Sequence, residues 1–157
     1  MRYTYKGMVA GLFAASVAAV VLKLNAQTGL LPAVDPIGAA GVLTGTGAVG
    51  GWIAFLILGA GVGALFAWLD PDLPGDSLRQ RGMILSSLIW AAMALFVMPL
   101  AGLGLFGLEH GLTLALAMLA VHLLFGAVLG GTYSWLVLQS APLRYRHARA
   151  APPHRTR

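Results

Sequence analysis

His122 is the residue of this chain whose type and position could most readily do chemistry. It lies about ten residues into a long apolar run, which in a helix is a depth of roughly 15 Å. It shares a helix face with Gly126 and Gly130. Because glycines favour close helix contact, this face predicts a side chain turned toward a neighbouring helix rather than toward lipid.

Three roles for His122 stay open from the residues alone. An imidazole without a partner at that depth costs roughly 1–3 kcal/mol, so the first interpretation is a structural histidine bonded to a serine or a backbone carbonyl. The second is axial ligation of a haem or chlorophyll, and the third is a proton relay or substrate contact. The candidate serine partners are Ser16, Ser86 and Ser87. A bis-histidine haem would need another deep histidine, and the others lie at a boundary or in the tail (His110, His147 and His154).

Two groups of acidic residues could bind a cation or act as acid and base. Asp35, Glu109 and His110 are expected on one side of the membrane, but their spacing matches no known signature. The run that holds Asp70, Asp72 and Asp76 offers oxygen ligands of the kind that magnesium and calcium prefer, without calcium-loop spacing. We interpret it as a solvated turn in which Asp76 caps the next helix.

No other catalytic set can be assembled from the sequence. The chain has no cysteine, which excludes disulfides, thiolate metal sites and cysteine nucleophiles. Neither a Ser-His-Asp set nor a glycine-rich phosphate loop is present. We therefore assign no catalytic residue, no metal site and no cofactor beyond the open question at His122, and expect that the protein is not an enzyme.

The composition requires lipid around the elements that hold these residues. Apolar residues make up 59% of the 157 positions and charged residues only 10%, against roughly 25% charged in soluble domains. Four segments reach the length of about 20 apolar residues that a bilayer needs, and none shows the alternation of a membrane strand. We predict an all-α membrane protein, a four-helix bundle in residues 1–138, with spans at about 7–24, 51–69, 82–101 and 112–138. The first span is too long for a signal-peptide core.

The basic residues set the predicted orientation. Nine of the ten lysines and arginines fall on the side of the two termini and only Lys23 on the other, a pattern typical of cytoplasmic termini in a bacterial inner membrane. Residues 139–157 form a basic cytoplasmic tail. Its arginines suit lipid head groups better than nucleic acid. The predicted head-group and topology contacts are Arg79, Arg81, Arg144, Arg146 and Arg149.

The outer loop between the first two spans contains a helix start. Asp35 can cap the helix and Pro36 suits its first position. The short helix that follows should end near Gly45 or Gly47 and lie at the membrane interface, with a re-entrant loop as the alternative.

The two halves of the chain resemble each other. Residues 59–69 (GAGVGALFAWL) align with 126–136 (GAVLGGTYSWL) at a shift of 67, and Lys6-Gly7-Met8-Val9 is similar to Arg81-Gly82-Met83-Ile84. This pattern indicates two parallel helical hairpins related by a pseudo-twofold axis. Small residues spaced by four predict helix-packing seams at three pairs of positions, namely Gly7 and Gly11, Gly59 and Gly63, and Gly126 and Gly130.

The order of these landmarks resembles an uncharacterised family of small bacterial four-helix membrane proteins. The resemblance rests on the Gly7–Gly11 opening, Leu30-Leu31-Pro32, Gly51-Trp52, the run from Met98 to Gly102, and His122-Leu123 with Gly126. The family implies the fold but no activity. A histidine often follows Gly-Trp in its members, whereas this chain has Ile53-Ala54-Phe55.

These observations give three hypotheses for function. The first is an accessory or scaffold subunit that acts through helix packing, alone or as a homo-oligomer, or with other membrane subunits and lipids. The alternative is a carrier or channel for a small or lipophilic solute with His122 on its pathway. The third is a haem- or pigment-binding subunit.

Overall fold

The computed structural model describes residues 3–29, 35–100 and 102–139. In this part of the chain, four helices are long and apolar enough to cross a membrane, as in a multi-pass membrane protein. The prediction of an all-α four-helix bundle is confirmed. The helices extend a few residues beyond the predicted spans, and the tail arginines Arg144, Arg146 and Arg149 lie outside the described residues.

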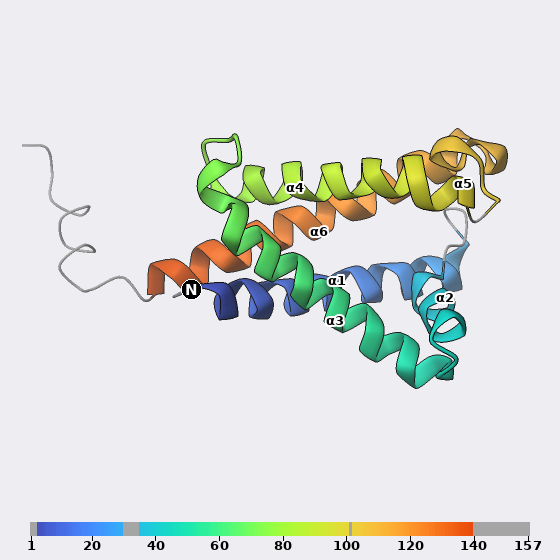
Figure 1. Cartoon of the computed structure of the whole chain (residues 1–157), viewed down its shortest axis with the longest axis horizontal. Helices are drawn as coiled ribbons and strands as arrows, with labels where there is room; N and C mark the ends of the chain where they lie inside the picture. The colour runs from blue at the N-terminus through green and yellow to red at the C-terminus, as the bar shows by residue number, and fades with distance from the viewer. Residues whose placement is uncertain (1–2, 30–34, 101, 140–157) are drawn as a thin grey trace, which may run out of the picture.

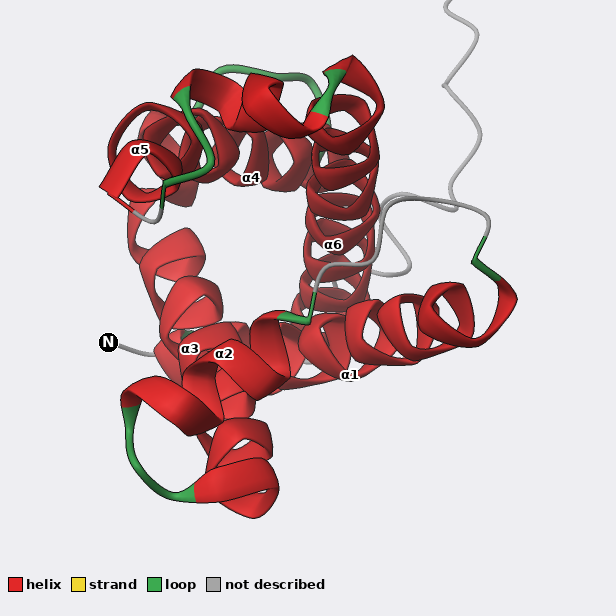
Figure 2. Ribbon diagram, turned by 90° about the vertical axis from the view of Figure 1, so that its right-hand side faces the viewer, coloured by secondary structure: helices red, strands yellow, loops and turns green. Residues whose placement is uncertain are grey.

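The chain folds as two helical hairpins. The first consists of α1 (Thr4–Thr28) and α3 (Gly47–Leu69), with the short α2 (Pro36–Leu43) between them. The second consists of α4 (Leu78–Ala92) and α6 (Leu112–Gln139). The hairpins meet through α1 and α6, so the helices follow one another in space as α3, α1, α6 and α4 (Figure 2). We call the end where α1 begins and α6 ends the terminal end, and the opposite end the α2 end (Figure 1).

Helix α1 is the centre of this arrangement because it packs against α3 and against α6. Its contact faces carry glycine and alanine, whose small side chains let both neighbours approach closely. Buried small residues recur along α1, at Gly7, Ala10, Gly11, Ala14, Ala15, Ala18 and Ala19.

The core between the hairpins lies toward the terminal end. Phe66 of α3 is fully buried, and its ring packs edge to face on Tyr133 of α6 with centroids 5.4 Å apart. Leu85 and Leu129 complete this core with Ala10 and Ala14. From there α3 diverges from α4 toward the α2 end, and the two helices make almost no contact (Figure 1).

The start of α2 is confirmed. The Asp35 side chain accepts a hydrogen bond of 3.0 Å from the backbone N–H of Gly38, and Pro36 occupies the first turn. Helix α2 ends at Leu43, just before Gly45. It packs back on α3, where a Cβ added to Gly51 would overlap the carbonyl oxygen of Ile37.

The third span is less regular than the sequence predicts. Helix α4 passes into a π-helical turn, η2 (Met93–Val97), and then into α5 (Met98–Leu100). A 3₁₀ segment, η3 (Leu105–His110), follows, in which Phe106 has a positive φ of 56°. Such a φ costs a residue with a side chain roughly 1–2 kcal/mol. Phe106 is held there by packing on Trp90, with ring centroids 5.6 Å apart.

The turn between the hairpins also differs from prediction. After the 3₁₀ turn η1 (Asp70–Asp72), α4 is capped by Ser77, whose hydroxyl accepts from the N–H of Gln80, while the Gln80 side chain returns to the N–H of Ser77. The prediction that Asp76 caps this helix is wrong, because the serine and glutamine form a complete capping box.

Candidate functional site

The six predicted seam glycines lie at contacts between helices. In the first hairpin, an added Cβ on Gly7 would overlap the carbonyl oxygen of Gly63, and one on Gly63 would overlap that of Gly7. Gly11 stands in the same relation to the carbonyl of Gly59. Backbone therefore contacts backbone along this seam, which only glycine permits.

The second hairpin has an equivalent seam with one member that sequence reasoning missed. Gly126 faces the carbonyl oxygen of Gly82, and Gly82 faces that of Gly126. Gly130 lies against the backbone of Leu78 and Arg79. The similarity of Arg81-Gly82 to Lys6-Gly7 was the signal that could have assigned Gly82 to the seam.

His122 lies beside this seam, and its ring Nδ1 and its backbone carbonyl oxygen both take part in hydrogen bonds. The ring Nδ1 is 2.8 Å from the carbonyl oxygen of Met118, one turn earlier in α6. Since a carbonyl can only accept, Nδ1 carries the proton, and in the neutral ring Nε2 keeps the lone pair. The backbone carbonyl of His122 accepts a hydrogen bond of 2.5 Å from the buried hydroxyl of Ser86 in α4.

The expected partners of the imidazole are corrected accordingly. Ser86 bonds the backbone of His122 rather than its ring, and Ser16 donates to the carbonyl of Leu12 in its own helix. The interpretation in which a backbone carbonyl satisfies the ring agrees with the structure. The hydroxyl of Ser86 links α4 to α6 beside Gly82 and Gly126.

Lys6 is a buried cation, although the sequence suggested only a topology signal. It is 4% exposed, and its Nζ donates to the carbonyl oxygen of Leu136 in the last turn of α6 at 3.1 Å. The rings of Tyr3 and Tyr5 lie 4.9 and 5.9 Å from Nζ. A cation is favourable at the carbonyl end of a helix, so Lys6 ties α1 to α6.

Arg81 makes the corresponding contact from the second hairpin. Its Nη1 donates to the carbonyl oxygen of Asp70 at the end of α3 and to the Asp70 carboxylate, at 2.9 and 3.1 Å. Its Nε donates to the carbonyl of Gly75. The expectation that Asp70 is a solvated turn residue is therefore corrected, because it forms an ion pair with Arg81 within the protein. The head-group role of Arg81 stays a prediction. Each hairpin thus caps the last carbonyls of the other.

Comparison with protein families gives a match over most of the chain. Residues 1–143 match a family of unknown function, DUF6789. The chain belongs to this family. No curated protein and no solved structure matches the chain. The expected resemblance to an uncharacterised family is confirmed.

The other predicted polar groups of this DUF6789 chain do not come together. Within the described residues, no three acidic, histidine or cysteine side chains are grouped so that they could hold a metal ion. Asp35 instead pairs with Lys23 across 3.8 Å at the exposed α2 end. The side chain of Glu109 packs beside Gly104. The cluster of Asp35, Glu109 and His110 is thus not formed.

One polar atom in the second hairpin lacks a partner. The indole Nε1 of Trp90 is buried and forms no hydrogen bond to any described residue. Trp90 lies one turn from Ser86 on α4 and packs against the cluster formed by Ala94, Met98, Leu114 and Met118. A buried donor without a partner lowers stability, so this end of the second hairpin is less well satisfied than the seam.

Proposed function

We propose that the protein is an accessory or scaffold subunit of a membrane assembly, acts through helix packing and is not an enzyme. The observation that carries this proposal is the use of its buried polar groups. Lys6, Ser86 and Arg81 all donate to backbone carbonyls of another helix, so they hold helices together. Large apolar side chains on α3 and α4 face outward, including Ile57, Trp68 and Leu88. They form a surface for lipids or partner helices.

Co-purification tests the scaffold role. The tagged full chain is isolated from its native host in mild detergent, with Trp68→Glu on the outward face of α3 as the perturbed variant and Asp72→Glu as a matched control outside that face. We expect partner subunits with the wild type and the control, and loss of them with Trp68→Glu. Recovery of the wild type alone, without a partner or a second copy, would contradict the role.

A haem- or pigment-binding role is the second candidate, and the ring geometry of His122 favours it. A histidine whose Nδ1 donates to a carbonyl presents Nε2 for ligation. The purified protein would then show an absorption band that disappears in His122→Ala. The packing role predicts no such band and a change in stability only. Solute flux that depends on His122 would favour the carrier instead.

The proposal places the protein in a bacterial inner membrane with both termini in the cytoplasm. It is supported by the helix ends that carry the cations: Lys6 lies in the first turn of α1 and Arg79 and Arg81 in the first turn of α4, whereas Lys23 lies near the other end of α1. The native chain has no cysteine, so Val42→Cys and Asp72→Cys can be labelled singly in intact cells. An impermeant maleimide should label Val42→Cys and leave Asp72→Cys unlabelled; the reverse pattern would overturn the orientation.

We also infer that the hairpins are an internal repeat. The aligned residues Phe66 and Tyr133 pack on each other, as expected for equivalent residues near a twofold axis. Lys6 and Arg81 each precede a seam glycine and donate to the end of the other hairpin's second helix. The repeat is inexact, because α1 packs along α6 while α4 barely contacts α3.

A further inference from the structure

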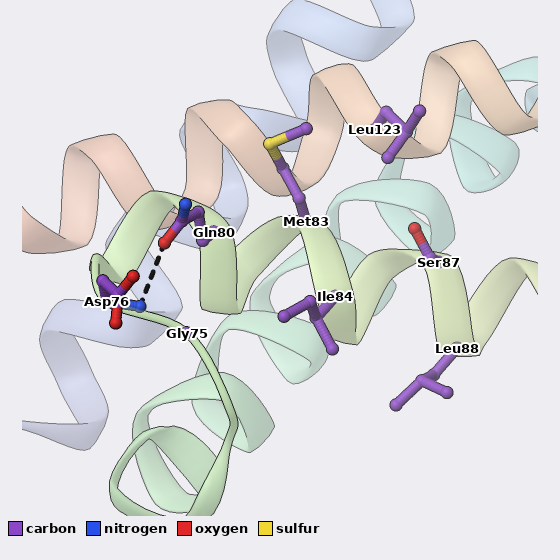
Figure 3. A pocket seen from close by; sticks show the side chains of 8 residues that line it. All are labelled: Gly75, Asp76, Gln80, Met83, Ile84, Ser87, Leu88 and Leu123. Atoms are coloured by element: carbon purple, nitrogen blue, oxygen red, sulfur yellow. Dashed lines mark hydrogen bonds between the residues drawn. The ribbon is translucent and has the colours of Figure 1, made fainter.

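An open groove of about 610 Å³ lies on the first turns of α4 (Figure 3). Its walls are mainly apolar and come from Met83, Ile84 and Leu88 of α4 and from Leu123 of α6, with Ser87 of α4 as a polar lining residue. Its end nearest the α3–α4 turn is polar and is formed by Gly75, Asp76 and Gln80. The groove therefore runs from the boundary of a predicted membrane span into that span.

The charges at its polar end are not neutralised within the described residues. Among the described residues, Lys23 forms an ion pair with Asp35 at the α2 end, and Arg81 forms one with Asp70. Asp76 and Arg79 take part in neither ion pair. Arg79 is exposed one helical turn before Met83 and on the same face of α4. Its guanidinium lies over α6, with Nε and Nη2 3.8 Å from a Cβ built on Gly131.

We propose that this groove binds one phospholipid whose phosphate contacts Arg79, whose primary ammonium contacts Asp76 and whose acyl chain lies along Met83, Ile84 and Leu123. Asp76 lines the polar end of the groove, and Arg79 lies beside the groove, one helical turn before its lining residue Met83. This separate anion and cation complement a zwitterionic head group. A guanidinium forms strong charge-assisted hydrogen bonds with phosphate. A primary ammonium can donate to a carboxylate, whereas a quaternary ammonium has no N–H to donate. The ligand is therefore a phosphatidylethanolamine from the surrounding bilayer.

Native mass spectrometry of the full chain in detergent tests the head group. The protein is titrated with phosphatidylethanolamine, phosphatidylcholine and phosphatidylglycerol of identical acyl chains. We expect the ethanolamine lipid to bind tightest. Arg79→Gln should weaken it about tenfold, as expected for the loss of one charge-assisted hydrogen bond. Lys23→Gln removes the same charge at the α2 end and should leave binding unchanged.

Asp76→Asn tests the ammonium contact separately. It should abolish the preference for ethanolamine over choline lipid while retaining the contribution of Arg79. Equal binding of the three lipids to the wild type, or equal binding to Arg79→Gln and Lys23→Gln, would overturn the proposal.

The acyl part has its own test. Leu88 is exposed and lines the groove, so Leu88→Trp should obstruct it and weaken all three lipids, without entering the helix seam. Leu116→Trp places the same side chain at an exposed position of α6 away from the groove and serves as the control. Equal lipid binding to both tryptophan variants would overturn the groove assignment. The inference goes beyond the scaffold role, because loss of the head-group contacts in Arg79→Gln or Asp76→Asn should leave the co-purification result unaffected.

Discussion

The two hairpins use the same backbone contact but fix it differently. In α1 and α3 the glycine seam continues into a stripe of buried alanines along α1. In α4 and α6 the seam is short, and a hydroxyl link from Ser86 to His122 follows it before the helix passes into the π-helical turn. Small residues permit close approach at several registers, whereas a hydrogen bond between helices selects one. Among the described residues, the second hairpin therefore adds a hydrogen bond between its helices to the glycine seam, whereas the first extends its seam with small side chains. We expect the register of the second hairpin to depend on this polar contact.

The seam glycines should give the largest effects. Gly63→Leu in the first hairpin and Gly126→Leu in the second force a side chain into an opposing carbonyl, so we expect each to cost at least about 3 kcal/mol of stability. Thermal unfolding followed by circular dichroism in detergent measures this. Gly61→Leu is the matched control, since an added Cβ at Gly61 meets nothing within 4 Å. Wild-type stability of both seam variants would show that the seams do not hold the hairpins together.

Loss of the buried cation should rank second. Lys6→Met keeps the length of the side chain but removes the charge-assisted hydrogen bond to Leu136, with an expected cost of about 2 kcal/mol. Lys23→Met removes an exposed ion pair at the other end and should cost less than about 1 kcal/mol. The two are compared by unfolding in the same detergent. Equal losses would mean that burial of Lys6 contributes nothing to holding α1 against α6.

The hydroxyl link should rank third and sharpen the contrast between the hairpins. Ser86→Ala removes a hydrogen bond between helices and should cost about 1 kcal/mol. Ser16→Ala removes a bond within α1 and should leave stability nearly unchanged. Cross-linking of cysteine pairs, one cysteine in α4 and one in α6, would report the register of these helices. Only Ser86→Ala should increase the number of pairs that cross-link. An unaltered pattern would assign the register to packing in both hairpins.

The smallest expected effect has the opposite sign. Trp90→Phe retains an aromatic ring against Phe106 but removes the unpartnered N–H, so we expect it to be neutral or to stabilise by up to about 1 kcal/mol. Trp68→Phe, at a position 73% exposed, should be neutral. The same unfolding assay compares them. Clear destabilisation by Trp90→Phe would mean that the indole N–H finds a partner in the folded protein.

Much of the fold could be predicted because lipid imposes simple rules. Run length determined the four helices, and glycine spacing located most of the seams. The register between the hairpins could not be predicted from such rules. The sequence shows that Lys6 is basic, but it does not show that the last turn of α6 lies next to Lys6. The π-helical turn after Trp90 was not predicted, because it lies within an apolar run whose composition indicates one continuous helix. The depth of His122 correctly predicted that its ring needs a hydrogen-bond partner. Whether that partner is a serine or a carbonyl of its own helix depends on local geometry, which the sequence does not give.

The central place of α1 has a consequence for biosynthesis. Chains emerge from the ribosome N-terminus first, so the helix with two contact faces is made before either neighbour. The face of α1 toward α3 can be covered as soon as α3 is made. The face toward α6 and the amine of Lys6 are covered only after α6, the last span, has left the ribosome. The bundle is therefore completed only when the final helix packs on α1. We expect a chain truncated before residue 112 to expose the alanine-lined face of α1 and to be degraded by quality-control proteases.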